Sequence, residues 1–138
     1  MLVLLDTNIF FSALLTHDGP PGRIYREWRS KRFELVTSTE QIDELRKASR
    51  NPKFSGILQP RDFGTLVNIL HRAIVYGPIP HKHQAADPAD SYLLDLMEAA
   101  QPDYAVTGDK RSGILHLDTL GRTKILSATA FSSQVLHL

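Results

Sequence analysis

One aspartate, Asp6, interrupts the most apolar stretch of the N-terminus, LVLLDTNIFFSALL. A lone carboxylate in an apolar interior costs several kcal/mol unless it is paired or bound to a metal. Asp6 is therefore expected either to lie at a sharp outward turn or to have a cationic partner. Asp109 has a similar setting, because it follows the apolar run YAVT and Gly108.

Two further carboxylates stand at places where a site can form. Glu44 is expected at the edge of the buried face of a helix, and Asp90 in the first turn of another. Converging carboxylates repel each other and raise each other's pKa. Mg²⁺ or Mn²⁺ relieves that repulsion, since both prefer oxygen ligands. Such ions activate water for attack on phosphorus, so hydrolysis of a phosphodiester is the reaction that this set suggests.

Each of these carboxylates also has a purely structural explanation. Asp6 could cap the helix that follows it, and Glu44 could be an ordinary solvated charge. Asp90 could interact with the dipole of its helix, which is worth about 0.3–1 kcal/mol. Asp109 could be a turn residue. The placement of two of them after strands favours the joint interpretation.

The elements that position these residues alternate between strands and helices along the whole chain. The apolar patterns predict strands at 2–5, 33–37, 73–76, 103–107 and 124–128. They predict helices at 8–15, 22–31, 38–50, 60–73, 89–100 and 129–136, with Ser38 and Gln41 as a capping box. This alternation indicates a parallel sheet covered on both faces, and ligands bind beyond the carboxyl ends of such strands.

Composition narrows the class of protein. A chain of 138 residues predicts one domain. It contains no cysteine, which excludes disulfides and thiolate chemistry and fits a reducing cytoplasm. We expect no signal peptide and no membrane span, because Asp6 breaks the only long apolar stretch near the N-terminus. The net charge of +1 neither indicates nor excludes nucleic acid.

Four motifs in order resemble the PIN domain family of metal-dependent ribonucleases. They are LLDTNIFFSALL, LVTSTEQIDELRKA, DPADSYLLDLMEAA and PDYAVTGDKRSGIL. The resemblance is closest to the VapC-like toxins of toxin–antitoxin systems. It implies a three-layer α/β/α sandwich with a central, mostly parallel sheet. It also implies Mg²⁺- or Mn²⁺-dependent endonucleolytic cleavage of RNA.

The resemblance assigns roles to individual residues. The metal-binding and catalytic set would be Asp6, Glu44, Asp90 and Asp109, supported by Thr7, Asn8 and Thr107. Many relatives carry a further aspartate after the third acid, where this chain has Ser91. The number of metal ions, one or two, therefore stays open. Asp87 either compensates for the missing acid or acts as a helix cap.

Several other side chains have both a binding and a structural interpretation. Lys110 and Arg111 are placed to contact a substrate phosphate, or they are turn residues. Two basic clusters, at 23–32 and 46–53, bind RNA phosphates or form a solvated surface, which we favour. Trp28 and Tyr25 stack on a base or, as is commoner, pack between helices. His81 and His83 form an H-x-H pair without an evident third ligand, and a plain loop is favoured.

Partners follow from the same resemblance. RNA is the expected substrate, and a cognate antitoxin or a second copy of the chain could dock on the apolar face of 10–15 or of 60–73. Core packing is the default for both faces. The alternative to an active nuclease is a PIN module of weak or no activity that binds nucleic acid or a protein partner.

Overall fold

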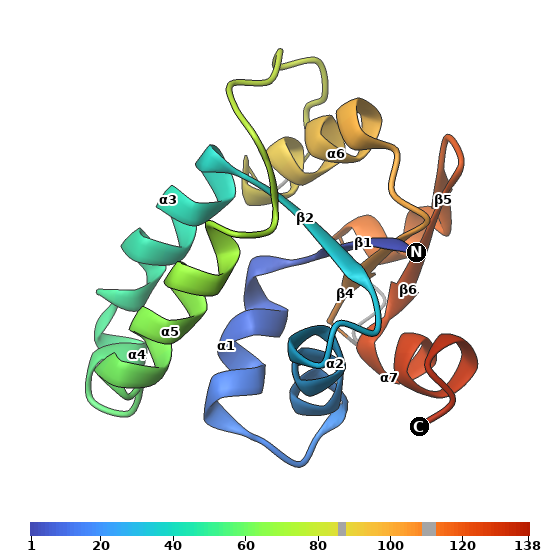
Figure 1. The fold of residues 1–138 in the computed structure, drawn as a ribbon. Helices are drawn as coiled ribbons and strands as arrows, with labels where there is room; N and C mark the ends of the chain where they lie inside the picture. The colour runs from blue at the N-terminus through green and yellow to red at the C-terminus, as the bar shows by residue number, and fades with distance from the viewer. Residues whose placement is uncertain (86–87, 109–112) are drawn as a thin grey trace.

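The computed structural model describes residues 1–85, 88–108 and 113–138, and its centre is a six-stranded sheet (Figure 1). The strands are β1 (Leu2–Leu5), β2 (Glu34–Ser38), β3 (Ile74–Tyr76), β4 (Tyr104–Thr107), β5 (Thr119–Leu120) and β6 (Thr123–Ser127). Their order in the sheet is β3-β2-β1-β4-β6-β5. All neighbouring pairs are parallel except β5 with β6, which form an antiparallel hairpin.

The helices connect these strands in the way that a parallel sheet requires. They are α1 (Thr7–Leu15), α2 (Pro20–Arg29), α3 (Thr39–Ser49), α4 (Pro52–Ser55), α5 (Pro60–Leu70), α6 (Pro88–Ala100) and α7 (Ala128–Ala130). A 3₁₀ helix at Gly113–Leu117 and a π-helical turn at Phe131–Val135 complete the described elements.

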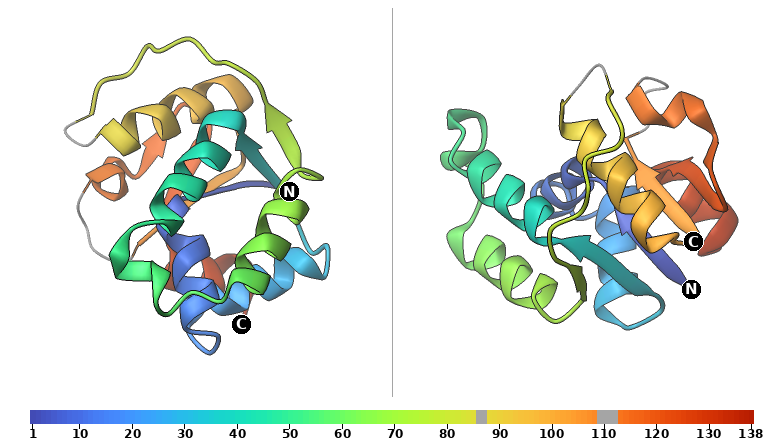
Figure 2. Two further views of the ribbon diagram at one scale, coloured as in Figure 1. Left: turned by 90° about the vertical axis from the view of Figure 1, so that its left-hand side faces the viewer. Right: turned by 90° about the horizontal axis from the view of Figure 1, so that it is seen from above.

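The sheet lies between two layers of helices. Successive strand residues point to opposite faces, so Leu4 and Ala105 join a buried cluster with α6, whereas Leu5 and Val106 join the cluster of α1, α2 and α3. Figures 1 and 2 show α6 on one side of the sheet and α1, α2 and α7 on the other. The predicted three-layer α/β/α sandwich with a mostly parallel sheet is confirmed.

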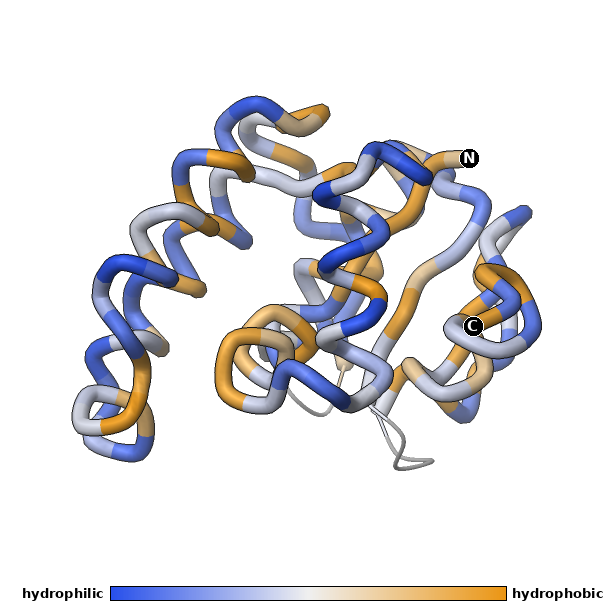
Figure 3. The backbone as a smooth tube through the Cα atoms, turned by 60° about the horizontal axis from the view of Figure 1, so that its bottom comes forward, coloured by the Kyte–Doolittle hydropathy of each residue, from blue (hydrophilic) through white to orange (hydrophobic). Residues whose placement is uncertain are grey.

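The helices on the side of the sheet opposite α6 are amphipathic. Figure 3 shows hydrophobic residues recurring between hydrophilic ones along the backbone. Phe10 and Phe11 of α1 are buried, and Phe11 stacks on Phe54 and Phe63 with ring centroids 4.5 and 6.2 Å apart. Leu66, Val67 and Leu70 of α5 are buried as well. Both faces considered for a partner therefore contribute to the protein's own core.

The predicted elements are present, but several boundaries differ. The last predicted strand begins and ends one residue earlier than expected. The helix predicted at 129–136 is a short α-helix followed by a π-helical turn. The helix α4, the 3₁₀ helix and β5 had not been predicted, because such short elements carry too few residues for a periodic pattern. Within the described parts of the chain, no helix is long and apolar enough to span a membrane.

Candidate active site at the ends of β1 and β4

Asp6 lies at the carboxyl end of β1, between β4 and the start of α1. Its backbone N–H donates to the Val106 carbonyl at 2.9 Å, which continues the pairing of β1 with β4 by one residue. Its side chain is half-buried and caps α1, with Oδ1 3.4 Å from the Asn8 backbone nitrogen. The Thr107 hydroxyl donates to Oδ2 at 3.0 Å. Asp6 therefore caps the helix and also faces the end of the sheet where ligands bind.

Thr7 connects the start of α1 to α6. Its Oγ1 lies 2.7 Å from the hydroxyl oxygen of Tyr92, and both side chains are buried. Burial raises the pKa of Tyr92, and the hydrogen bond with Thr7 opposes that shift only in part. The negative charges of Asp6, Glu44 and Glu40 raise the pKa of this hydroxyl further. Carboxylates from two separate parts of the chain, the end of β1 and the helix α3, therefore act on one point beside Asp6.

Glu44 and Asp90 reach this end of the molecule from α3 and α6. Both side chains are half-buried. Glu44 lies at the edge of the buried face of α3, next to the fully buried Leu45, as predicted. Asp90 lies in the first turn of α6, two residues before Tyr92. A Cβ atom at Gly113 would lie 2.8 Å from the Asp90 Oδ2 atom, so Asp90 packs against the start of the 3₁₀ helix.

The described residues do not form a complete metal site by themselves. Among residues 1–85, 88–108 and 113–138, no three side chains of aspartate, glutamate or histidine are grouped so that they could hold a metal ion. Asp109, Lys110 and Arg111, as well as Asp87, lie outside the described residues. In the sequence, Thr107 stands two residues before Asp109, and Gly113 stands two residues after Arg111. Thr107 contacts Asp6, and Gly113 lies next to Asp90.

Gln41 is a supporting residue that the sequence had indicated only as part of a helix cap. Ser38 caps α3 as predicted, accepting from the Gln41 backbone nitrogen at 3.1 Å. The Gln41 side chain does not complete a reciprocal capping box. It is fully buried, and it donates to the Leu5 carbonyl at 2.7 Å and accepts from the Thr37 hydroxyl at 2.5 Å. Gln41 thus ties α3 and β2 to the residue that precedes Asp6.

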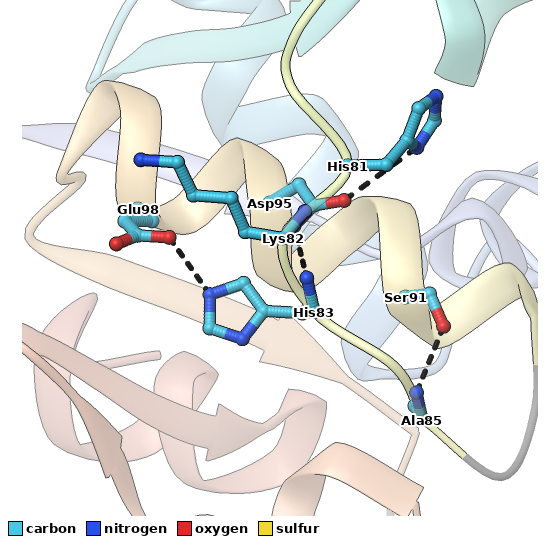
Figure 4. A network of polar contacts seen from close by, with 7 residues as sticks. All are labelled: His81, Lys82, His83, Ala85, Ser91, Asp95 and Glu98. Carbon is cyan, nitrogen blue, oxygen red and sulfur yellow. Dashed lines mark hydrogen bonds and ion pairs between the residues drawn. The ribbon is translucent and has the colours of Figure 1, made fainter.

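Ser91 has a hydrogen-bond partner in the loop before α6. Its hydroxyl accepts a hydrogen bond from the Ala85 backbone nitrogen at 2.9 Å, which fastens the loop before α6 to that helix (Figure 4). Deeper along α6, the buried Asp95 accepts from the backbone nitrogens of Lys82 and His83 at 3.0 and 2.8 Å. The loop is therefore held by backbone hydrogen bonds to two side chains of α6.

The two loop histidines pair with carboxylates of α6. His83 Nε2 lies 2.9 Å from Glu98 Oε2, and His81 Nδ1 lies 3.7 Å from Asp95 Oδ2 (Figure 4). Each histidine has a different carboxylate partner, and neither belongs to a metal-binding group among the described residues. The interpretation of the H-x-H pair as an ordinary loop stays a prediction.

Other residues for which a binding role and a structural role were both considered either pack between helices or lie on the surface. Trp28 is buried and meets Phe10 edge to face, with ring centroids 6.2 Å apart, so it packs between helices. Two basic residues form ion pairs on the surface: Arg32 with Glu27 at 2.8 Å and Arg46 with Asp43 at 3.8 Å. Asn8 is exposed, and its backbone N–H faces Asp6.

A family model described as PIN domain matches residues 2–111, most of the chain. The chain belongs to the PIN domain family. PIN domains are in general nucleases, and they typically use divalent metal ions. The matched region contains all four motif carboxylates of this PIN domain, Asp6, Glu44, Asp90 and Asp109. Comparison with curated proteins and with solved structures gives no match.

Proposed function

We propose that this PIN domain is an endoribonuclease that requires Mg²⁺ or Mn²⁺, and that it acts as the toxin of a toxin–antitoxin pair. The observation that carries the proposal is the half-buried Asp6 at the joined ends of β1 and β4, held by Thr107. Glu44 and Asp90 approach the same end from α3 and α6. The proposed catalytic set is Asp6, Glu44, Asp90 and Asp109.

The residues at this place fit a hard divalent cation. Their donor atoms are carboxylate and hydroxyl oxygens, which Mg²⁺ and Mn²⁺ prefer. The pKa of Tyr92 is raised by Asp6, Glu44 and Glu40 as well as by burial, so the local field favours a cation. Asp6, Asp90 and Asp109 would hold the ion, and Glu44 would reach it or orient a water. The bound ion would supply an activated water and neutralise charge on the phosphate.

The remaining residues of the chain would position these groups. The Thr107 hydroxyl donates to one oxygen of Asp6 and so would fix the orientation of the carboxylate. Thr7 and Tyr92 join α1 to α6 and so fix the distance between Asp6 and Asp90. Gln41 holds the end of β1 through the Leu5 carbonyl. Lys110 and Arg111, next to Asp109, are proposed to contact the substrate phosphate.

Cleavage assays on matched single-stranded RNA, single-stranded DNA and a small phosphoester test this function. We expect the purified protein to cut RNA internally with Mn²⁺ or Mg²⁺, to leave 5′-phosphate ends, and to stop when EDTA is added. Asp6→Asn should abolish cleavage, because it removes a negative charge but keeps an acceptor for the cap of α1. The matched control is Asp18→Asn, an exposed aspartate beyond the other end of α1, which should cleave like the wild type.

Three outcomes would contradict the proposal. Cleavage of RNA that persists in the Asp6→Asn variant would show that this carboxylate set is not catalytic. Hydrolysis of the DNA or of the small phosphoester with RNA left intact would assign the same site to another substrate. A wild type that binds RNA or a protein but never cleaves would favour the alternative of an inactive PIN module.

The role as a toxin is tested separately in cells. Controlled expression of the wild-type chain in a bacterium should arrest growth, whereas the Asp6→Asn variant should not. Co-expression of the neighbouring small reading frame should relieve the arrest if that frame encodes the antitoxin. If the wild-type chain cleaved RNA in the test tube but its expression left growth unaffected, the result would argue against a toxin.

A further inference from the structure

A cavity lies between α1, α2 and α5, apart from the candidate active site. Its volume is about 540 Å³. We call it the α2 pocket and define it by its charged and aromatic lining: His17, Tyr25, Arg26, Arg29, Arg61 and Asp62. Ala13 and Leu14 of α1 contribute its apolar floor. None of these residues belongs to the candidate active site.

The α2 pocket carries an excess of positive charge. Three arginines, Arg26, Arg29 and Arg61, face one carboxylate, Asp62. In the described part of the chain, no ion pair joins any of these arginines to an acidic side chain. Arg26 donates to the His17 carbonyl at 2.6 Å, which uses only one of the five N–H donors of its guanidinium. The pocket therefore retains donors for an anion.

Tyr25 provides a flat surface beside these donors. Its ring is half-buried, and the Arg29 guanidinium carbon lies 5.9 Å from the ring centroid. Burial raises the pKa of Tyr25 and the nearby Arg29 lowers it, which places the tyrosine hydroxyl and the guanidinium in one microenvironment. Aromatic rings next to arginines are the usual means of binding single-stranded nucleic acid without reading its sequence.

The walls of the α2 pocket are held in place by the packing of α2 against the preceding loop. A Cβ atom at Gly22 would lie 2.2 Å from the His17 carbonyl oxygen, so only glycine allows this approach. The pocket also has a fixed relation to the candidate active site, because α1 runs from one to the other. Leu14 lies about two helical turns, or roughly 12 Å, beyond Asp6.

We infer that the α2 pocket binds a backbone phosphate of the RNA substrate, with the neighbouring base against Tyr25. This inference rests on the proposed function only in taking RNA as the substrate. Guanidinium groups bind phosphate through two parallel hydrogen bonds, and an RNA strand offers the phosphate and the flat base together. An acidic polypeptide would satisfy the arginines but would leave the tyrosine ring without a matching group.

Binding of a short fluorescent oligouridylate, measured by anisotropy in EDTA so that no cleavage occurs, tests this inference. Arg61→Ala and Arg29→Ala should each weaken binding about tenfold, the loss of one charged hydrogen bond. Each should also reduce the magnitude of the slope of log affinity against log salt concentration by roughly one, the loss of one phosphate contact. The control is Arg72→Ala, which removes the same charge from an exposed position just beyond the other end of α5.

Equal affinities for Arg61→Ala and Arg72→Ala would overturn the inference, provided that both variants melt like the wild type. If Arg61→Ala and Arg29→Ala lost binding to a polyglutamate peptide while their RNA binding stayed unchanged, the inference would be overturned in favour of an acidic polypeptide. Failure of the proposed function would look different. In that case RNA is not cleaved with Mn²⁺, whereas the dependence of RNA binding on Arg61 persists.

Discussion

The Thr107 hydroxyl donates a hydrogen bond of 3.0 Å to the carboxylate of Asp6, although the two residues are 101 positions apart in the chain. They meet because β1 and β4 are adjacent and parallel, and each residue stands where its strand ends. The contact fixes the orientation of a carboxylate that the sequence places at an apolar junction. It gives Thr107, which lies in the fourth motif PDYAVTGDKRSGIL, a physical role in the candidate site.

Replacing Thr107 by valine should therefore impair metal use more than folding. We expect the Mn²⁺ concentration for half-maximal cleavage to rise about 10- to 100-fold, as when other supporting hydrogen bonds to metal ligands are lost. The control is Thr123→Val, which removes another buried threonine hydrogen bond, to the Pro102 carbonyl at 2.7 Å. Both variants should lose about 1–2 kcal/mol of stability. Equal cleavage by the two would count against a role for Thr107 in the site.

The buried Gln41 should contribute to both stability and activity. Gln41→Leu leaves the Thr37 hydroxyl without its acceptor and the Leu5 carbonyl without its side-chain donor. We expect the free energy of unfolding to fall by about 2–3 kcal/mol, as for other broken buried networks. Cleavage should fall as well, since Leu5 precedes Asp6. Gln134→Leu, at an exposed position, should change stability by less than about 0.5 kcal/mol.

Sequence patterns predicted the architecture better than the site. Alternating apolar strands and amphipathic helices specify a parallel sheet covered on both faces, because the faces have to be buried. They also place Asp6 and Thr107 at strand ends. The sequence alone did not reveal Tyr92 or Asp95 and indicated Gln41 only as part of a helix cap, since a buried polar residue inside an apolar helix face gives no periodic signal. Its importance depends on which distant residue it meets.

The roles of the four carboxylates stay predictions for a related reason. Sequence spacing orders Asp6, Glu44, Asp90 and Asp109 along the chain, but the distances between them depend on how α3 and α6 pack. The structure brings Glu44 and Asp6 near the hydroxyl of Tyr92. Asp109 lies outside the described residues. The family resemblance, rather than any distance, is what unites the four.

Gly113 should affect activity through Asp90. Gly113 and Gly121 both have φ of +57°, so alanine costs about 1–2 kcal/mol of backbone strain at either position. They differ in their surroundings. A Cβ at Gly113 meets Asp90 Oδ2 at 2.8 Å, whereas nothing lies within 4 Å of a Cβ at Gly121. Gly113→Ala should therefore lower the cleavage rate, by up to about a hundredfold for a displaced carboxylate.

Equal melting temperatures of the two alanine variants, with cleavage lost in Gly113→Ala alone, would locate the effect at Asp90. If both variants cleaved RNA equally well, the position of Asp90 beside Gly113 would be irrelevant to activity.

The raised pKa of Tyr92 predicts a loss of stability at alkaline pH. Tyrosine in the unfolded chain ionises near its ordinary pKa of 10, while the folded protein resists ionisation of the buried hydroxyl. Above that pH the unfolded state binds fewer protons than the folded state, so the free energy of unfolding falls as pH rises. Below it, this contribution is fully present.

Melting temperatures measured from pH 8 upward test the prediction (a range that brackets the ordinary tyrosine pKa of about 10). The decline should begin as the pH approaches that value, and Tyr92→Phe should make it shallower although it loses the bond to Thr7. Tyr25→Phe should remove a second part of the decline, because burial also raises the pKa of Tyr25. An unchanged slope in both variants would mean that other groups cause the alkaline loss.

Asp95 should hold the loop that precedes α6. Its side chain is 3% exposed and accepts hydrogen bonds from the Lys82 and His83 backbone nitrogens. Asp95→Leu should speed hydrogen exchange of these two amides by about tenfold or more, since each loses a bond to a charged acceptor. Ser91→Ala should instead affect the Ala85 amide, whose acceptor it removes. Asp95→Asn keeps an acceptor oxygen and should retain most of the protection.

Exchange measured amide by amide by NMR distinguishes the three variants. Equal protection of Lys82 and His83 in the leucine variant would show that the loop is held by other contacts.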